Sequence, residues 1–253
     1  MVSREAADIP RIAFNIALSL PSRKPLKEAV ICDVGGGIGL FSVGCAAAGF
    51  GRVILVDDFS DQINQTVGES ILAIHRSYGV RVVSRDVVAQ GVGDLNERLD
   101  VVTSFDSMEH WHRSPKQLFR ELLSAMNAGG RFVLAVPNCV NLRKRLTVPL
   151  GRGKWSAMKD WYEPEVFRGH IREPDVQDLL YIAADLGLED ARVLGRNWLG
   201  WQSDKKLLRI AASFLDPLIR LRPSLCSNIY LVGTKPGGDA RTVSTERSFR
   251  PVT

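Results

Sequence analysis

The chain has 253 residues, of which 45% are hydrophobic, enough for one α/β domain with a substantial core. A formal charge of +5 favours anionic partners without requiring any. The four cysteines form no C-x-x-C pair, so we expect reduced thiols in a cytoplasmic protein instead of a disulfide framework. No segment reaches the length of a membrane span, and residues 12–20 lack the features of a signal peptide.

An N-terminal segment, residues 1–28, is expected to be helical and to precede the main domain, residues 29–235. This domain opens with an apolar strand, Val30 to Cys32, that leads into Asp33, and an Ala-rich helix follows from about Leu40 to Ala48. Glycines between them let the backbone turn sharply and approach a ligand that a Cβ would repel. The helix start then offers unpaired N–H groups to an anion. These glycines are Gly35, Gly36, Gly37 and Gly39.

The second strand, Arg52 to Val56, ends at Asp57, a carboxylate that can accept hydrogen bonds from ribose hydroxyls. Asp58 follows as a second acid, although only one is needed for a ribose. This outline of strand, glycine turn, helix, strand and acid fits an adenosine-containing cofactor. An alternative is that the glycine turn serves only tight packing.

The glycine spacing separates two classes of adenosine cofactor. A dinucleotide fingerprint needs G-x-G-x-x-G/A, but reading from Gly35 places Leu40 at the last position, and reading from Gly37 places Ser42 there. Neither frame fits, so the spacing opposes a nicotinamide-dependent oxidoreductase.

Helices and strands alternate through the rest of the main domain. Periodicity and end signals predict helices over residues 60–79, 114–129, 173–187 and 204–221. Apolar runs predict strands over residues 80–83, 99–105, 131–136, 191–194 and 228–233. Such alternation with short turns implies an α/β fold with a doubly wound, mainly parallel sheet.

Particular residues refine the expected helices. Ser60 is the candidate N-cap of the first, and Ser114 to Gln117 predicts a capping box at the start of the second. The last should break near Pro217. The third is expected to present one apolar face to the core, formed by Val176, Leu179, Leu180 and Ala183.

Residues 138–170 lose periodicity and are interpreted as an insertion over the ligand face. Their cations could hold phosphate or carboxylate and their aromatic faces could stack on sugar rings, which suggests a glycan, nucleotide-sugar or lipid-linked acceptor. The alternative is a solvated basic loop anchored by aromatic core residues. The side chains concerned are Arg143, Lys144, Arg145, Arg152, Lys154, Trp155, Trp161, Tyr162 and Phe167.

Two C-terminal segments complete the chain. The stretch Lys205 to Arg222 mixes apolar and basic residues and could lie on an anionic membrane, but packing against its own domain is favoured, so peripheral membrane contact is not expected. Residues 236–253 are polar and are expected to be disordered. Nucleic-acid binding is not expected either, because the basic residues cluster in one insertion without a dedicated motif.

The spacing Asp33-x-Gly35-x-Gly37-x-Gly39 resembles the first motif of class I S-adenosylmethionine-dependent methyltransferases. The resemblance covers about residues 29–235 and implies a Rossmann-like fold whose seven-stranded, mainly parallel sheet has an antiparallel last strand. It is nearest to the subgroup typified by ubiquinone and menaquinone biosynthesis. Further segments that carry it are Asp86-Val87, Leu99 to His110, Asn127 to Asn138 and Gly169 to Glu173.

By this resemblance S-adenosylmethionine is the cofactor, with Asp33 orienting its methionine end, Asp57 binding its ribose and Asp86 contacting its adenine. A turn acid that only caps a loop is the alternative for Asp86. The full set of cofactor residues that the resemblance implies is Asp33, Gly35, Gly36, Gly37, Gly39, Asp57, Asp58, Asp86, Val87 and Ser104.

A sulfonium cofactor already makes its methyl group electrophilic, so the protein must mainly align an acceptor atom. A sugar hydroxyl is a poor nucleophile and would benefit from a general base. His110 and His170, both expected at the carboxyl edge of the sheet, are the candidate bases, although each could instead pack its loop. No metal site is expected, because Glu109, His110 and His112 lack a partner pair at convincing spacing.

The sequence therefore predicts a methyltransferase, and the favoured reaction is O-methylation of a small molecule or of a glycan or cell-envelope intermediate that can be anionic. One alternative is a methyltransferase-like protein that binds the cofactor without catalysis. The other, less favoured, is the nicotinamide-dependent oxidoreductase.

Overall fold

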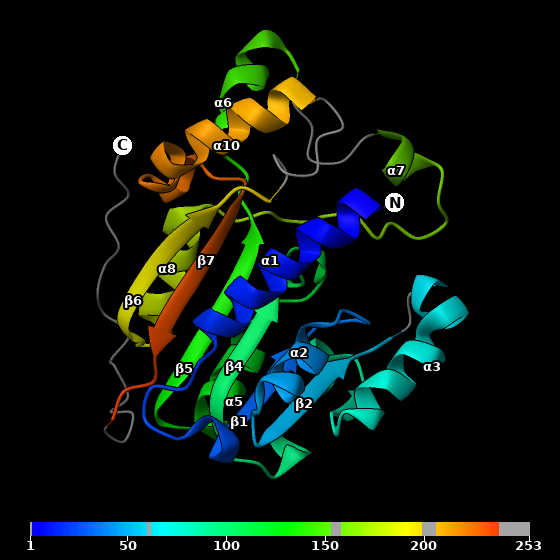
Figure 1. The fold of residues 1–253 in the computed structure, drawn as a ribbon, viewed down its shortest axis with the longest axis vertical. Coiled ribbons are helices and arrows are strands. Elements are labelled where there is room, and N and C mark those ends of the chain that lie inside the picture. The colour runs from blue at the N-terminus through cyan, green and yellow to red at the C-terminus, as the bar shows by residue number, and fades with distance from the viewer. Residues whose placement is uncertain (1, 60–61, 153–157, 199–205, 238–253) are drawn as a thin grey trace.

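A computed structural model describes residues 2–59, 62–152, 158–198 and 206–237 (Figure 1). Its strands are β1 (Val30–Val34), β2 (Arg52–Asp57), β3 (Arg81–Ser84), β4 (Leu99–Phe105), β5 (Met126–Pro137), β6 (Glu189–Arg196) and β7 (Asn228–Thr234). Within the described ranges they form one sheet of seven strands in the order β3-β2-β1-β4-β5-β7-β6. The pairings among β1 to β5 are parallel, and β7 runs antiparallel to β5 and β6. This confirms the predicted sheet with its antiparallel last strand.

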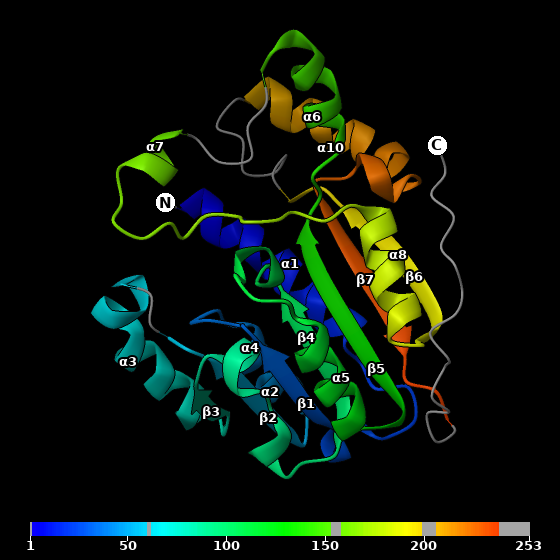
Figure 2. The same cartoon turned by 180° about the vertical axis from the view of Figure 1, so that it is seen from behind.

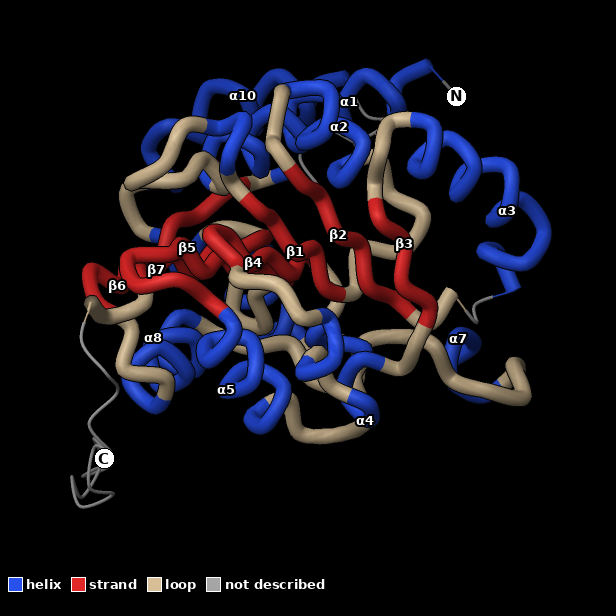
Figure 3. Tube along the Cα trace, turned by 90° about the horizontal axis from the view of Figure 1, so that it is seen from below, coloured by secondary structure: helices blue, strands red, loops and turns tan. Residues whose placement is uncertain are grey.

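Helices cover both faces of the sheet, as a doubly wound fold requires (Figures 2 and 3). They are α1 (Val2–Leu18), α2 (Phe41–Ala48), α3 (Gln62–Ser77), α4 (Val87–Gln90), α5 (Lys116–Ala125), α6 (Leu142–Thr147), α7 (Met158–Tyr162), α8 (Val176–Asp185) and α10 (Lys206–Arg220). Figure 3 shows α1, α2, α3 and α10 on one face and α4, α5 and α8 on the other. Short 3-10 turns lie at Leu26–Glu28, Gly93–Leu95, Met108–His110, Val148–Leu150 and Pro223–Leu225.

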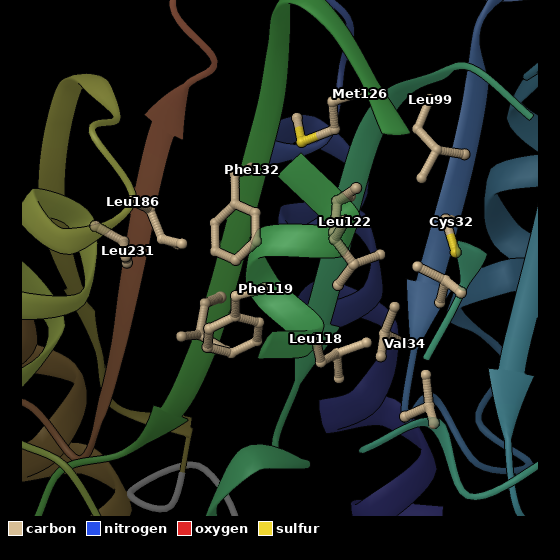
Figure 4. Close-up of a cluster of buried hydrophobic side chains, with 14 of the residues drawn as sticks. Cys32, Val34, Leu99, Leu118, Phe119, Leu122, Met126, Phe132, Leu186 and Leu231 are labelled. Atoms are coloured by element: carbon tan, nitrogen blue, oxygen red, sulfur yellow. The ribbon is translucent and has the colours of Figure 1, made fainter. Parts of the chain in front are cut away.

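The larger core cluster lies between the sheet and the helices α5 and α8 (Figure 4). Leu118, Phe119 and Leu122 of α5 are almost fully buried, because positions i, i+1 and i+4 share the inward side of a helix. The Phe119 ring meets the Phe132 ring of β5 edge-to-face, with centroids 5.5 Å apart. This packing fixes the position of β5 and of its neighbour β4, and the carboxyl end of β4 borders the candidate site.

Neighbouring leucines on α8 give a direct measure of this packing. Leu179→Ala is expected to lower the free energy of unfolding by about 2–5 kcal/mol, because Leu179 is fully buried and its loss leaves a cavity. Leu180→Ala should change it by less than about 1 kcal/mol, since Leu180 is 37% exposed. Urea denaturation of both variants checks this. Equal losses would contradict the burial pattern and restore the sequence prediction that Leu180 faces the core.

Helix α5 starts at Lys116, close to the start of the helix predicted over residues 114–129, but the predicted C-terminal end is wrong. It ends at Ala125, and Gly129 and Gly130 lie inside β5, which starts at Met126 because that residue already pairs with Leu99 of β4. The predicted capping box is also wrong. The Ser114 hydroxyl accepts only a long bond of 3.4 Å from the Lys116 N–H, and the Gln117 side chain donates to Glu121.

The last helix differs from its prediction in two ways. Pro217 lies inside α10 without ending it, since Asp216 pairs with Arg220 one turn later and accepts a hydrogen bond from Asn197. In α10 the polar residue Asp216 is buried, whereas the apolar residues Phe214 and Leu218 are exposed. These two apolar side chains therefore do not pack against the domain, although packing of this stretch was expected. Ser60, Lys154, Trp155 and the tail beyond residue 237 lie outside the described residues.

No helix in the described ranges is long and apolar enough to cross a membrane.

Candidate cofactor and acceptor site

The candidate site lies at the carboxyl ends of β1, β2 and β4, where the order of the strands reverses direction. The chain moves outward from β1 to β2 and β3, then crosses to β4 on the other side of β1. The connection after β1 therefore runs towards one edge of the sheet, and the connection after β4 runs towards the other edge. A crevice forms between these two connections at the carboxyl ends of the strands, and ligands of open α/β sheets bind there. Asp33, Asp57 and the loop after β4 meet at this edge, as the sequence predicts.

Asp33 is buried at the end of β1. Its carboxylate accepts hydrogen bonds from Ser42 Oγ (2.9 Å) and Thr103 Oγ1 (3.0 Å). Burial raises the pKa of Asp33 to about 6 even though both hydroxyls favour the charged form. The missing Cβ of Gly36 leaves room for this carboxylate, because a Cβ there would overlap with Asp33 Oδ2.

The glycine loop turns where only glycine is comfortable. Gly35 and Gly37 have φ values of +70° and +57°, in the left-handed region. The Gly35 N–H donates to Val56 O at 2.8 Å, which joins the loop to the end of β2. A Cβ on Gly37 would meet no atom within 4 Å, so the loop presents bare backbone to open space at this position.

Asp57 closes β2 and faces this loop. Its Oδ2 accepts a hydrogen bond from the Gly37 N–H at 2.8 Å, and its Oδ1 accepts one from the Phe59 N–H at 3.2 Å. Burial raises the pKa of Asp57, and these two N–H groups oppose that rise. The neighbouring Asp58 is exposed at the rim. The two acids are therefore distinguished by burial, which the sequence could not show.

Asp86 is the N-cap of α4, where its Oδ1 accepts hydrogen bonds from the N–H groups of Val88 and Ala89, each at 3.1 Å. The alternative interpretation of this residue, a turn acid, thus describes its local structure correctly. Asp86 and Val87 also line the same cavity as Asp57, which keeps them available to a ligand. The two interpretations of Asp86 are compatible.

A cavity of about 540 Å³ joins these residues to the loop after β4. Gly35, Gly37, Asp57, Asp58, Asp86 and Val87 line one part of it, and Ser107, His110, Trp111, Phe167 and Arg168 line the other. Gly36, Gly39 and Asp33 border a second cavity of about 340 Å³ beside α1. Ser104, also expected to contact the cofactor, is buried on β4 and lines neither cavity.

The sequence did not indicate how α1 and α3 hold the site. Arg11 of α1 forms an ion pair with Asp106, which follows β4 and has a left-handed φ of +48°. His75 of α3 is fully buried and places Nε2 2.9 Å from the carbonyl oxygen of Gly39. Strained or buried polar residues of this kind gather at functional sites. Both contacts join distant parts of the chain, so no local pattern predicts them.

The two candidate bases meet although they are 60 positions apart. Their rings are edge-to-face with centroids 4.8 Å apart, and they converge because the carbonyl oxygen of Glu109 accepts a hydrogen bond from the Ile171 N–H at 2.7 Å. Nδ1 of His170 lies 2.7 Å from Glu173 Oε1. His110 lines the cavity, whereas His170 is not among the residues that line it. The structure thus brings both histidines to one place but exposes only His110 to a ligand in the cavity.

Glu173 joins His170 to the insertion. Its other oxygen is paired with Lys144, which is buried, so this lysine is not available to an acceptor. Burial alone would raise the pKa of Glu173, but the hydrogen bonds from His170 and Lys144 lower it below its usual range. Arg145 is also used internally, since it donates to the carbonyl oxygens of Val140 (2.6 Å) and Ser224 (3.3 Å).

Solved structures with the same fold are methyltransferases, although their low identity to this chain supports the fold alone. An S-adenosylmethionine-dependent methyltransferase from Archaeoglobus fulgidus is 17% identical, with a TM-score of 0.56 over 92% of this chain and 94% of that one. One from Mesorhizobium loti is 18% identical, with a TM-score of 0.54 over 92% and 99%. A geranyl diphosphate C-methyltransferase from Streptomyces coelicolor is 17% identical, with a TM-score of 0.57 over 90% and 79%. No curated protein sequence matches this chain.

The site residues fit S-adenosylmethionine. Asp57 lines the cavity at the end of β2, the glycine loop presents backbone that a Cβ would cover, and Asp86 lines the same cavity. Asp57 would hold the ribose, and Asp86 with Val87 would border the adenine. The family model of the methyltransferase domain matches residues 8–193, most of the chain. The protein therefore belongs to the family of methyltransferase-domain proteins.

Proposed function

We propose that the protein transfers the methyl group of S-adenosylmethionine to an oxygen of a small-molecule or glycan-type acceptor that carries negative charge. The observation that carries this proposal is the continuity of the cavity, which runs from Asp57 and Asp86 to His110 and Arg168. A cofactor bound at the acids would leave the second part of the cavity for the acceptor. Positioning within one cavity can supply much of the rate enhancement of such a transfer.

His110 supports oxygen as the acceptor atom. Its Nδ1 lies 3.0 Å from the carbonyl oxygen of Arg168, and donation of a proton to that oxygen makes Nε2 the basic nitrogen. A general base beside an acceptor hydroxyl contributes about 10²- to 10⁴-fold to the rate of the reaction. Arg168 lines the same cavity, and its guanidinium is the kind of group that pairs with a phosphate or a carboxylate of an acceptor.

The first test is calorimetric titration of S-adenosylhomocysteine into the full chain. Asp57→Ala is expected to weaken binding about 100-fold, because charge-assisted bonds to a half-buried carboxylate contribute about 1.5–3 kcal/mol each. Asp58→Ala is the matched control and should weaken binding less than about threefold, since Asp58 is exposed. Wild-type protein that fails to bind would contradict the assignment of the cofactor.

The same protein then distinguishes catalysis from binding alone. Incubation with S-adenosylmethionine and a set of anionic hydroxylated acceptors should release S-adenosylhomocysteine only when an acceptor is present. Tight cofactor binding without methyl transfer to any acceptor would favour the non-catalytic alternative. Transfer to amines but not to hydroxyls would overturn the proposal that oxygen is the acceptor atom.

A further inference from the structure

Three potential metal ligands from two distant segments converge at the wall of the cavity. Glu109 and His110 belong to the 3-10 turn after β4, and His170 lies at the end of the insertion. One ligating atom from each lies within 4.8 Å of the other two. Two histidines and one carboxylate are a common set for a divalent transition-metal ion.

Each histidine has a hydrogen-bond partner that suits metal binding by its other nitrogen. Nδ1 of His170 lies 2.7 Å from Glu173 Oε1, and Nδ1 of His110 lies 3.0 Å from the carbonyl oxygen of Arg168. Histidine ligands of metals usually donate their second ring N–H to a carboxylate or a backbone carbonyl in this way. In that tautomer Nε2 of each ring has the lone pair that a metal ion requires.

Glu109 supplies an independent observation. The residue is 1% exposed, and its Oε2 is buried and accepts no hydrogen bond from any group that the structure describes. A buried carboxylate oxygen that accepts no hydrogen bond costs free energy in the folded state. A bound cation would satisfy this oxygen.

We propose that Glu109, His110 and His170 bind one divalent transition-metal ion, with Zn²⁺ as the probe. An ion about 2.0–2.2 Å from each donor needs the donors roughly 3.0–3.5 Å apart. The observed spacing within 4.8 Å needs only small side-chain rotations to reach this geometry. The two imidazoles favour Zn²⁺ over Mg²⁺, which prefers oxygen ligands.

Metal binding goes beyond the proposed O-methylation and does not depend on it. The ion would lie beside the acceptor part of the cavity, because His110 lines that cavity. A metal-bound oxygen is more acidic than a free one. Nε2 of His110 would be a ligand while the ion is bound, and it would be the base proposed above only in the metal-free protein.

The test is a titration of Zn²⁺ into chelator-treated full-length protein, followed by calorimetry, with Co²⁺ absorption as a spectroscopic readout. One ion per chain is expected. His110→Ala, His170→Ala and Glu109→Gln should each weaken binding at least about 100-fold. Glu173→Gln should weaken it about 10- to 100-fold, as loss of a partner of a ligating histidine does.

His112→Ala is the matched control, because it removes a histidine two positions from His110 that is not part of the cluster. It should retain the wild-type affinity within threefold. Absence of Zn²⁺ binding, equal loss in His112→Ala, or no loss in the three ligand variants would overturn the proposal. Equal competition by Mg²⁺ would overturn the choice of ion. Titration of each variant with S-adenosylhomocysteine shows whether the variant is folded. If the wild type does not bind the cofactor, the proposed function fails, but the Zn²⁺ titration still tests the metal site.

Discussion

Gly35→Ala is expected to lower the free energy of unfolding by about 2–5 kcal/mol and to abolish binding of S-adenosylhomocysteine. Two effects add. An L-residue is strained at a φ of +70°, and the new methyl group would overlap with Ser107 Oγ and lie 2.7 Å from Ser107 Cβ. Ser107 is part of the cavity wall, so relief of the overlap would move that wall. Denaturant unfolding and calorimetry measure the two losses separately.

Gly37→Ala is the matched control, since Gly37 has a similar φ of +57° but a Cβ there would meet nothing within 4 Å. Only the backbone strain remains, so the loss of stability should be about 1–2 kcal/mol. Cofactor binding should still weaken, because the methyl group would project from a residue that lines the cavity. Equal stability of the two variants would show that contact with Ser107 does not restrict the loop.

Much of the cofactor half of the site could be predicted from the sequence, because its residues follow directly from strand ends. An acid after an apolar strand must lie at the carboxyl edge of a parallel sheet, which places Asp33 and Asp57 without further information. Asp86 was placed by the same logic, and the structure adds that it caps α4. Ser104 differs from these acids because its buried side chain lines neither cavity, and its contact with the cofactor stays a prediction.

The acceptor half could not be predicted, because it depends on contacts between distant loops. Glu109 and His110 are adjacent in sequence, but the third member of their cluster, His170, is brought to them by the hydrogen bond from Ile171 to Glu109. No periodicity or spacing encodes that bond, so the expectation that no metal site is present considered only the nearby His112. The ion pair between Arg11 and Asp106 was missed for the same reason.

The end of the predicted helix at Gly129 shows a second limit of local patterns. The sequence near Met126 fits a helix, and two glycines are a common stop signal. In the structure, strand pairing of Met126 with Leu99 ends the helix earlier, and tertiary contacts override the local preference. Met126 is fully buried in β5.

Asp33→Asn is expected to stabilise the protein and to weaken cofactor binding at the same time. Burial raises the pKa of Asp33 from an ordinary value of 3.8 to about 6, so the ionised carboxylate destabilises the folded state at neutral pH. At about 1.4 kcal/mol per pH unit, the asparagine variant should gain up to about 3 kcal/mol at pH 7.5. The hydroxyls of Ser42 and Thr103 can rotate to serve the amide.

The sign of the pH dependence follows from the same shift. Between the unfolded pKa of 3.8 and the folded pKa of about 6, the folded state binds a proton that the unfolded state does not. The contribution of Asp33 to stability therefore falls as pH rises through this window and is constant above it. The difference in unfolding free energy between wild type and Asp33→Asn should be near zero at pH 4 and largest above pH 6. A constant difference would contradict the raised pKa.

Cofactor binding should change in the opposite direction from stability. By the resemblance to methyltransferases, Asp33 orients the methionine end of the cofactor, whose ammonium group favours an ionised partner. Wild-type affinity for S-adenosylhomocysteine should therefore fall as pH drops through about 6, while the weaker affinity of Asp33→Asn stays flat. If Asp33→Asn is more stable than the wild type and still binds S-adenosylhomocysteine tightly, the charge of Asp33 is not needed for cofactor binding. The expected result is that the protein retains a destabilising carboxylate because the cofactor needs its charge.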